Sequence, residues 1–161
     1  MKPDTVRRVV IGVAEAGGGL YGAFITLTSI RSAQNAVAFT VSWVMLAGFL
    51  ATSVAGFLLL RGGRWASPLL IGLKVPQLVG LNSSLLSVHW WSGAWFAVSM
   101  RAGAAPSLEP GLGAGRRIWL GGEGAPLIVS INLAAAIVIW QLIVLMKADR
   151  STPPDTTRDP A

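Results

Sequence analysis

Four long apolar stretches constrain this chain more than any other feature of its sequence. They cover residues 9–30, 37–60, 65–86 and 126–146. Each is close to the roughly 20 residues that a helix needs to cross a hydrocarbon core about 30 Å thick. In lipid, every backbone N–H and C=O group must find a partner within the protein, so such stretches form helices or parts of closed barrels. We therefore predict an all-α membrane protein built as a four-transmembrane-helix bundle.

The composition agrees with this prediction. Apolar residues make up 53% of the 161 residues and charged residues 12%, whereas a soluble domain carries about 25% charged residues. The mean hydropathy is +0.61. We expect a transmembrane domain over residues 1–148 and a disordered cytoplasmic tail over residues 149–161, which is rich in proline, threonine and aspartate.

The residue types that are missing exclude several classes of protein. The chain has no cysteine and a single histidine, His89. It therefore cannot form a disulfide, use a thiolate nucleophile or bind haem through two of its own histidines. We expect no metal, no cofactor and no enzymatic activity. The net charge of +6 does not indicate nucleic-acid binding, because the basic residues lie at the ends of the apolar stretches.

The basic residues also predict an orientation. Eight of them flank the apolar stretches on the side that carries both termini: Lys2, Arg7, Arg8, Arg61, Arg64, Lys147, Arg150 and Arg158. Four lie on the other side: Arg31, Arg101, Arg116 and Arg117. Because cytoplasmic loops carry the excess of lysine and arginine, we predict a multi-pass protein with cytoplasmic N- and C-termini. In this orientation, residues 61–64 should form a tight cytoplasmic turn. The composition, rich in alanine, glycine and arginine, favours a bacterial plasma (inner) membrane.

Residues 87–125 form a long loop with a high content of glycine, which is incompatible with a helix. Residues 91–100 and 117–120 alternate with a period of two, which is typical of strands. We predict a short extracytoplasmic β-hairpin between the third and fourth helices, with its turn at residues 102–115. An irregular loop and a re-entrant segment are the alternatives.

Tryptophans are enriched at the two interfaces of a membrane, where their rings lie at the level of the headgroups. Five tryptophans lie near predicted span ends or in the long loop, and we expect them to act as interfacial anchors: Trp65, Trp90, Trp91, Trp95 and Trp119.

Two ionisable residues lie inside apolar stretches, and such residues indicate a functional site because their burial is costly. Glu15 and Lys74 lie at depths of about 9 and about 14 Å from the same side, so their side chains can meet. Three interpretations are open. The pair can lock the first helix against the third, Lys74 can extend unpaired to the surface, or the two residues can serve transport or binding.

Polar amides extend this set of intramembrane candidates. Gln77 is one turn from Lys74, and Asn82 and Asn132 have similar predicted depths, so we expect amide hydrogen bonds between helices. Pro76 should kink the third helix, because proline removes one backbone donor.

Small residues at a spacing of four lie in the first two apolar stretches, as Gly18 and Gly22 and as Gly48, Thr52 and Gly56. This spacing allows helices to approach closely. It predicts either packing within the bundle or self-association of two copies.

The segment Ala14-Glu15-Ala16-Gly17-Gly18 resembles the first helix of the small multidrug resistance transporters. This resemblance, over about five residues, implies a role for Glu15 in binding protons and drugs. The present chain differs from that family in its long loop over residues 87–125 and in Lys74 of the third stretch.

Three functions follow from these observations. The first is a structural or accessory subunit of a membrane assembly, whose partners are the lipid bilayer and other membrane subunits. The second is a small proton-coupled transporter or channel element that uses Glu15 and Lys74. The third is an immunity- or inhibitor-type membrane protein, a class that is small and lacks catalytic groups.

Overall fold

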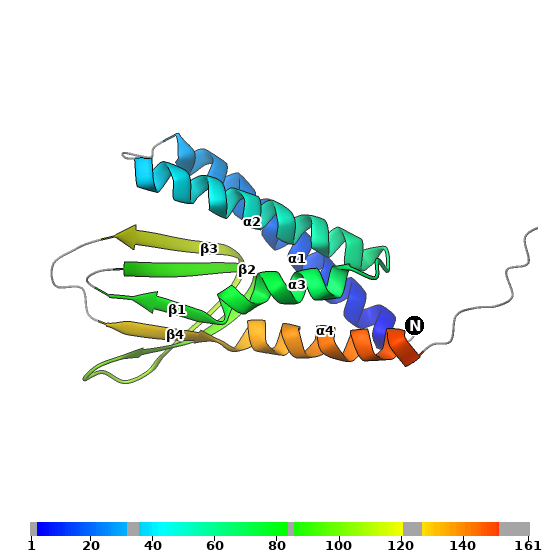
Figure 1. The fold of residues 1–161 in the computed structure, drawn as a ribbon. Coiled ribbons are helices and arrows are strands. Elements are labelled where there is room, and N and C mark those ends of the chain that lie inside the picture. The colour runs from blue at the N-terminus through cyan, green and yellow to red at the C-terminus, as the bar shows by residue number, and fades with distance from the viewer. Residues whose placement is uncertain (1–2, 32–35, 84–85, 121–126, 152–161) are drawn as a thin grey trace, which may run out of the picture.

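The computed structural model describes residues 3–31, 36–83, 86–120 and 127–151, and in them it shows four α-helices and a four-stranded antiparallel sheet (Figure 1). The helices are α1 (Pro3–Ile30), α2 (Ala36–Leu60), α3 (Ala66–Lys74) and α4 (Leu133–Ser151). A short 3-10 turn, η1 (Val75–Gln77), follows α3. The strands are β1 (Val79–Asn82), β2 (Leu86–Arg101), β3 (Ser107–Leu120) and β4 (Ile128–Asn132).

The predicted bundle of four transmembrane helices is wrong. Among the described residues, only α1 and α2 are both long and apolar enough to cross a membrane. Helix α3 has 9 residues, and α4 carries Lys147, Asp149 and Arg150 in its last turns. The end of the third apolar stretch and the start of the fourth contribute the strands β1 and β4 to the sheet.

Local sequence explains where α3 ends and where α4 begins. Pro76 cannot donate a backbone hydrogen bond, so α3 ends at Lys74 instead of continuing with a kink. In the fourth stretch, residues 128–131 hold three β-branched side chains, which favour a strand. Helix α4 begins only after Asn132.

Helices α1 and α2 form an antiparallel hairpin whose backbones lie very close together. A Cβ atom on Gly56 of α2 would be 2.5 Å from the backbone nitrogen of Ala16, and one on Gly19 of α1 would be 2.6 Å from the carbonyl oxygen of Phe49. Small residues therefore set the distance between these two helices.

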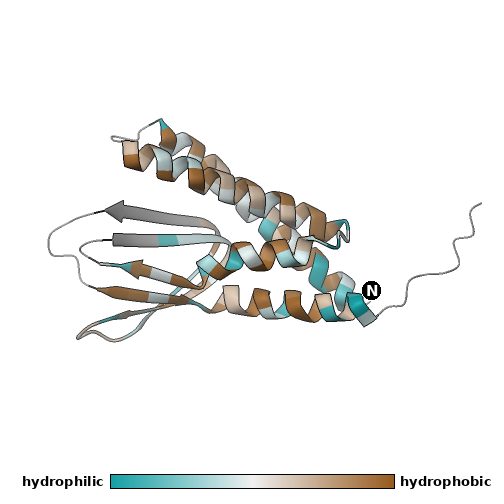
Figure 2. Ribbon diagram, in the orientation of Figure 1, coloured by the Kyte–Doolittle hydropathy of each residue, from teal (hydrophilic) through white to brown (hydrophobic). Residues whose placement is uncertain are grey.

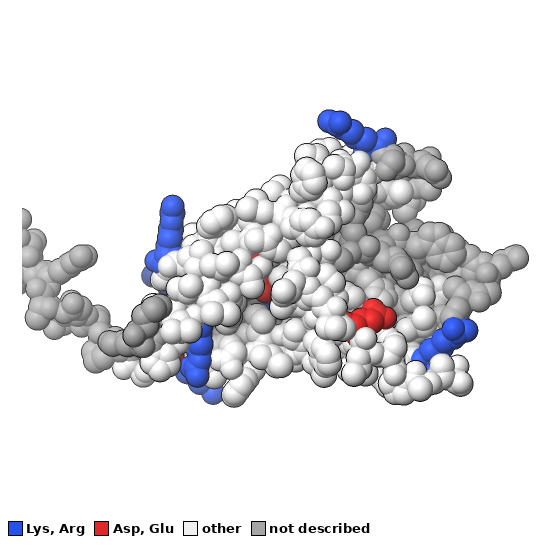
Figure 3. All heavy atoms as spheres, turned by 180° about the vertical axis from the view of Figure 1, so that it is seen from behind, with Lys and Arg blue, Asp and Glu red and all other residues white. Residues whose placement is uncertain are grey.

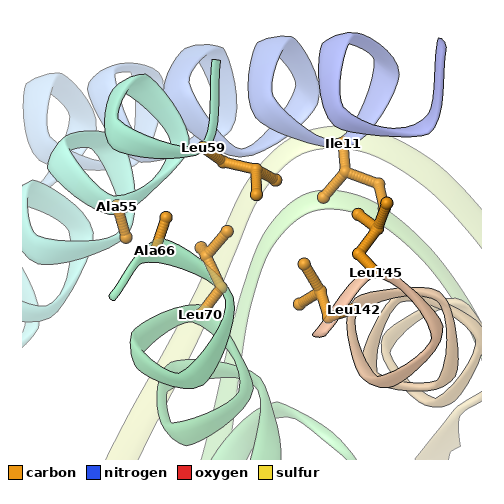
Figure 4. Packing of buried hydrophobic residues seen from close by; sticks show 7 residues of the cluster. All are labelled: Ile11, Ala55, Leu59, Ala66, Leu70, Leu142 and Leu145. Atoms are coloured by element: carbon orange, nitrogen blue, oxygen red, sulfur yellow. The ribbon is translucent and has the colours of Figure 1, made fainter. Parts of the chain in front are cut away.

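All four helices meet in one apolar cluster (Figure 4). The side chains come from α1, α2, α3 and α4, and all are buried: Ile11, Ala55, Leu59, Ala66, Leu70, Leu142 and Leu145. This cluster joins the short helices α3 and α4 to the long hairpin.

The turn predicted at residues 61–64 is confirmed. The N–H of Gly63 donates to the carbonyl of Leu58 at 2.8 Å, the N–H of Gly62 donates to that of Leu59 at 3.1 Å, and Gly62 has φ +72. These two bonds and the left-handed glycine are the glycine-based cap that ends many helices. The turn, the N-terminus and the end of α4 lie at the same end of the molecule (Figure 1).

Strands β2 and β3 form a hairpin that is longer than predicted. Their pairing runs from Leu86↔Leu120 to Ser99↔Ser107, so residues 107–115 belong to a strand and not to the turn. Aromatic side chains cover two of the glycines there: the ring of Trp95 of β2 lies over Gly111, and the ring of Tyr21 of α1 lies next to Gly113.

Strands β2 and β3 curve strongly along their length (Figure 1), and a pair of glycines with positive φ allows a bend within the hairpin. Gly93 and Gly113 are paired across the strands and have φ +77 and +114, values that residues other than glycine rarely adopt. Gly18 of α1 packs on this point, since a Cβ there would lie 2.1 Å from the nitrogen of Gly93. The hairpin is therefore held against the middle of α1.

Strand β4 pairs with β1 on one side and with residues 97–101 of β2 on the other. Strand β1 also pairs with the first residues of β2, so β1, β4 and β2 close a circuit of hydrogen-bonded strands. The predicted short hairpin on the membrane surface is thus replaced by a four-stranded sheet that packs against α1.

Apolar residues dominate the helices and strands β1 and β4 (Figure 2). On the face that Figure 3 shows, lysines and arginines lie toward the two ends of the molecule, and the surface between them carries carboxylates but no basic group. Residues 149–151, which the sequence assigned to a disordered tail, belong to α4, which continues to Ser151. Residues 152–161 lie outside the described part of the chain.

Candidate functional site

Glu15 and Lys74, the two ionisable residues of the apolar stretches, lie together in the centre of the fold. The Lys74 Nζ is 2.8 Å from Oε2 of Glu15. The side chain of Lys74 is 0% exposed and that of Glu15 is 1% exposed. An ion pair links α1 to the end of α3, which is the pairing that the sequence analysis put forward.

The ammonium group of Lys74 has a partner for each of its three N–H donors. Besides Glu15, it donates to Oε1 of Gln77 at 3.2 Å and to the backbone carbonyl of Ser92. An ammonium group has three donors and no acceptor. The donor capacity of this buried cation is therefore fully used within the protein.

Gln77 is the second centre of the cluster and is also fully buried. Its Oε1 accepts from the backbone N–H of Ser92 at 2.9 Å, in addition to Lys74. Its Nε2 donates to the carbonyl of Leu73 at 3.0 Å and to Oγ of Ser92 at 3.1 Å. The hydroxyl of Ser92 also lies 3.5 Å from Oε2 of Glu15.

The position of this cluster follows from the shape of β2. This strand pairs with β1 only at residues 87–88 and with β4 only at residues 97–101. Between these segments one edge of β2 has no neighbouring strand. Side-chain oxygens act there as the acceptors that a neighbouring strand would provide. The N–H of Ser92 donates to Oε1 of Gln77, and the N–H of Phe96 donates to Oδ1 of Asn132 at 3.2 Å. The polar residues thus satisfy backbone groups whose burial would otherwise be costly.

Asn132 joins the sheet to the last helix. Its Oδ1 also accepts from the N–H of Ala135 at 3.3 Å, which caps the first turn of α4. Asn82 lies at the other end of the β1–β4 ladder, opposite Ile128. The predicted meeting of Asn82 with Asn132 is therefore not found.

The tryptophans occupy different environments. Trp65 is 68% exposed at the start of α3, with the Arg64 guanidinium carbon 5.5 Å from its ring centroid. Trp90 packs against Phe49 with ring centroids 6.0 Å apart, and Trp91 is buried and stacks on Trp95.

Trp65 therefore has the exposure of an interfacial anchor, whereas Trp90 and Trp91 pack within the fold. The side chain of Trp119 lies outside the described part of the structure.

The small residues that predicted close helix contacts are used within the chain. A Cβ on Gly22 would lie 2.3 Å from the ring of Phe49, and one on Gly48 would lie 2.6 Å from the ring of Trp90. Gly18 and Gly56 contact Gly93 and Ala16, as described above, and Thr52 is fully buried. Self-association through these positions would require the chain to open.

Sequence reasoning did not find Ser92, which bonds to all three of the other members of the cluster. No local signal marks this serine, because its role arises only where β2 bends away from its neighbours. In the described residues no three histidine, aspartate or glutamate side chains come close enough together to hold a metal ion.

Neither protein-family models nor searches of curated proteins and solved structures give a match to this chain. The site must therefore be interpreted from its geometry. Glu15, Lys74, Gln77 and Ser92 form a closed network in which a buried charge is neutralised and strand edges are capped.

Proposed function

We propose that this chain is an integral membrane protein that serves as a structural or accessory subunit of a membrane assembly. In this proposal it resides in the plasma membrane of a bacterium, crosses it several times and keeps both termini in the cytoplasm. The ion pair of Glu15 and Lys74 then has the role of a lock between α1, α3 and β2.

The observation that carries the structural role is the saturation of Lys74. A transport site must exchange its ligand or proton with water, whereas this cation is 0% exposed and has three protein partners. Bonds that hold α1 to the bend of β2 are those expected of a scaffold.

The surface supports residence in a membrane. Large apolar side chains are exposed along the outer faces of three helices, including Val13, Phe24, Val54, Phe57 and Trp140. Exposed apolar patches of this extent are rare on soluble monomers and indicate contact with lipid or with other proteins.

The orientation can be tested with cysteine variants, because the natural chain has no cysteine. Arg61 and Ala104 are both exposed, in the α2–α3 turn and the β2–β3 turn. We expect a membrane-impermeant maleimide to label Ala104→Cys in intact cells and Arg61→Cys only after permeabilisation. Labelling of both residues in intact cells would contradict the proposed orientation, in which the two turns lie on opposite sides of the membrane.

The subunit role is tested by crosslinking in native membranes followed by purification in mild detergent. We expect a stoichiometric partner of wild type, and the double variant Glu15→Gln/Lys74→Met, which removes both buried charges together, should retain it. The two proteins are also compared in proteoliposomes for proton flux. If no partner is found and the double variant loses a proton flux that wild type shows, the protein is a transporter and the proposal fails.

A further inference from the structure

The circuit of β1, β4 and β2 has an inner face that is small and polar. Across the ladders Gly80 faces Ser130, Ser130 faces Ser99, and Asn132 faces Ala97. All five residues are buried. The hydroxyl groups of Ser99 and Ser130 are hydrogen-bonded to each other at 2.7 Å.

The residues between them point to the other face and are apolar throughout. Val79 is 56% exposed and Ile131, its register partner, is 40% exposed. Phe96 and Met100 of β2 are also exposed, while Leu81, Val98 and Val129 are half-buried. A soluble antiparallel sheet has its apolar side inward and its polar side in water. This sheet has the reverse arrangement, which is typical of strands in a membrane.

The position of the circuit along the helices agrees with this pattern. The hairpin bend contacts α1 at Gly18. The length of α1 from Arg8 to Gly18 is about 15 Å at 1.5 Å per residue, which is half of a hydrocarbon core about 30 Å thick. From Lys147 to Leu133, α4 covers about 21 Å. A core of that thickness which begins near Lys147 therefore continues past α4 into β4.

We propose that the outer face of the β1–β4–β2 circuit lies in the outer leaflet of the bilayer and contacts lipid acyl chains. This inference rests on the proposed membrane residence of α1 and α2. It adds that the sheet is not a domain in water, because its strands extend the membrane-embedded surface beyond the ends of α3 and α4.

Acyl chains are the occupant that the surface favours. The apolar face of the strands is continuous with the exposed side of α4, where Leu133 and Ile137 follow Ile131 along the chain. No described residue that faces outward on β1, on β4 or on residues 96–100 of β2 is charged. Arg101 follows at the end of the strand, where a charge would reach the headgroups. Strands β1 and β4 each have a hydrogen-bonded neighbour on both sides, as lipid requires.

The test uses spin labels on single cysteines in full-length protein reconstituted into phosphatidylcholine vesicles. Oxygen concentrates in acyl chains and a nickel chelate stays in water, so their collision rates with the label report its surroundings. We expect Val79→Cys and Ile131→Cys to show oxygen collision rates several-fold above those for the nickel chelate. Val54→Cys on α2 serves as the lipid reference, and Ala104→Cys in the β2–β3 turn as the water reference.

The possible outcomes separate the two proposals. If the nickel chelate reaches the labels at Val79→Cys and Ile131→Cys as readily as it reaches Ala104→Cys, the sheet lies in water and the inference is overturned. If Val54→Cys is at the same time in lipid, the proposed membrane residence still holds. Low access of both reagents would mean that a second copy or another protein covers the face, which also overturns it. Nickel access at Val54→Cys would instead refute the proposed function. The two positions lie on different strands, so the failure of one variant to fold leaves the other.

Discussion

The helical half and the strand half of this molecule have similar exteriors and different interiors. Both expose apolar side chains, for example Val54 on α2 and Val79 on β1. The helical half is filled by the apolar cluster that includes Leu59 and Leu142. The strand half is filled by small and polar residues such as Ser130.

The difference shows that the interior follows the hydrogen bonding of the backbone. A helix satisfies its own N–H and C=O groups, so its side chains are free to be apolar on every side. A strand depends on its neighbours, and where β2 leaves them, Gln77 and Asn132 provide the missing partners. The burial of these two polar side chains is thus explained by the unpaired edge of β2.

The largest loss of folded protein is expected from a substitution at Gly18, where the two halves touch. The Gly18→Val variant would place a Cβ atom 2.1 Å from the backbone nitrogen of Gly93 and 2.9 Å from the carbonyl oxygen of Gly113. Backbone atoms of a paired hairpin cannot move aside as a flexible side chain can. We expect loss of folded, monodisperse protein in detergent, measured by size-exclusion chromatography.

The adjacent glycine provides a matched control for this prediction. A Cβ atom on Gly17 would meet nothing within 4 Å, and alanine is the better helix former by about 1 kcal/mol. Gly17→Ala should therefore fold at least as well as wild type. If Gly18→Val gives the same yield and melting temperature as Gly17→Ala, the contact between the halves is not as described.

The next effect is expected at the ion pair. Lys74→Met would leave the carboxylate of Glu15 buried without its cation, and breaking a buried pair in this way costs about 3–5 kcal/mol. The double variant Glu15→Gln/Lys74→Met removes both charges and should recover part of that loss. The free energy of unfolding, measured by denaturant titration in mixed micelles, checks both results.

The ion pair of Arg8 and Asp149 provides the control, because it joins α1 to α4 at a more exposed position. Breaking it shows what the loss of an ion pair costs when the charges are not buried. Pairs of this kind contribute about 0.2–1 kcal/mol. A loss for Lys74→Met no larger than the loss for Arg8→Met would show that the buried pair is not a structural lock.

A smaller effect is expected for Asn132→Ala, which removes the cap of α4 and the partner of the Phe96 N–H together. Loss of an N-cap costs about 1 kcal/mol, and the loss of the part-buried hydrogen bond from the Phe96 N–H adds about 0.5–1.5 kcal/mol. The free energy of unfolding provides the measurement. The variant Ser99→Ala provides the comparison.

Ser99→Ala removes only the bond between two hydroxyl groups of the inner face. Bonds of this kind within membranes contribute about 0.6 kcal/mol on average. If the two variants lose equal stability, the role of Asn132 in completing the edge of β2 is refuted.

Some of the fold could be predicted from the sequence because it depends on local patterns. The long helices appear in the first two apolar stretches, and the Arg-Gly-Gly-Arg turn is marked by its glycines. The pairing of Glu15 with Lys74 is one of the three interpretations that the sequence leaves open, because both residues lie inside apolar stretches that start from the same side. The alternation in residues 91–100 correctly indicated a strand in that region.

The third and fourth apolar stretches were misassigned because hydropathy cannot distinguish a buried helix from a buried strand. Residues 79–82 and 128–132 become strands because they pair with each other from about fifty positions apart. Residues 107–115 were assigned to a turn on account of their glycines. In the fold, Trp95 covers one of them, Gly111, and β2 provides the ladder.

The sequence by itself therefore determined the apolar exterior, the two long helices, the turn between α2 and α3, and the polar residues that must be paired. Only the tertiary structure decided that the end of the third apolar stretch and the start of the fourth form strands, that Ser92 joins the ion pair, and that Gly18 meets Gly93. The physical reason is that a helix forms its hydrogen bonds four residues away, where a local pattern reveals them. A strand forms them with distant segments, so its partners exist only once the chain has folded.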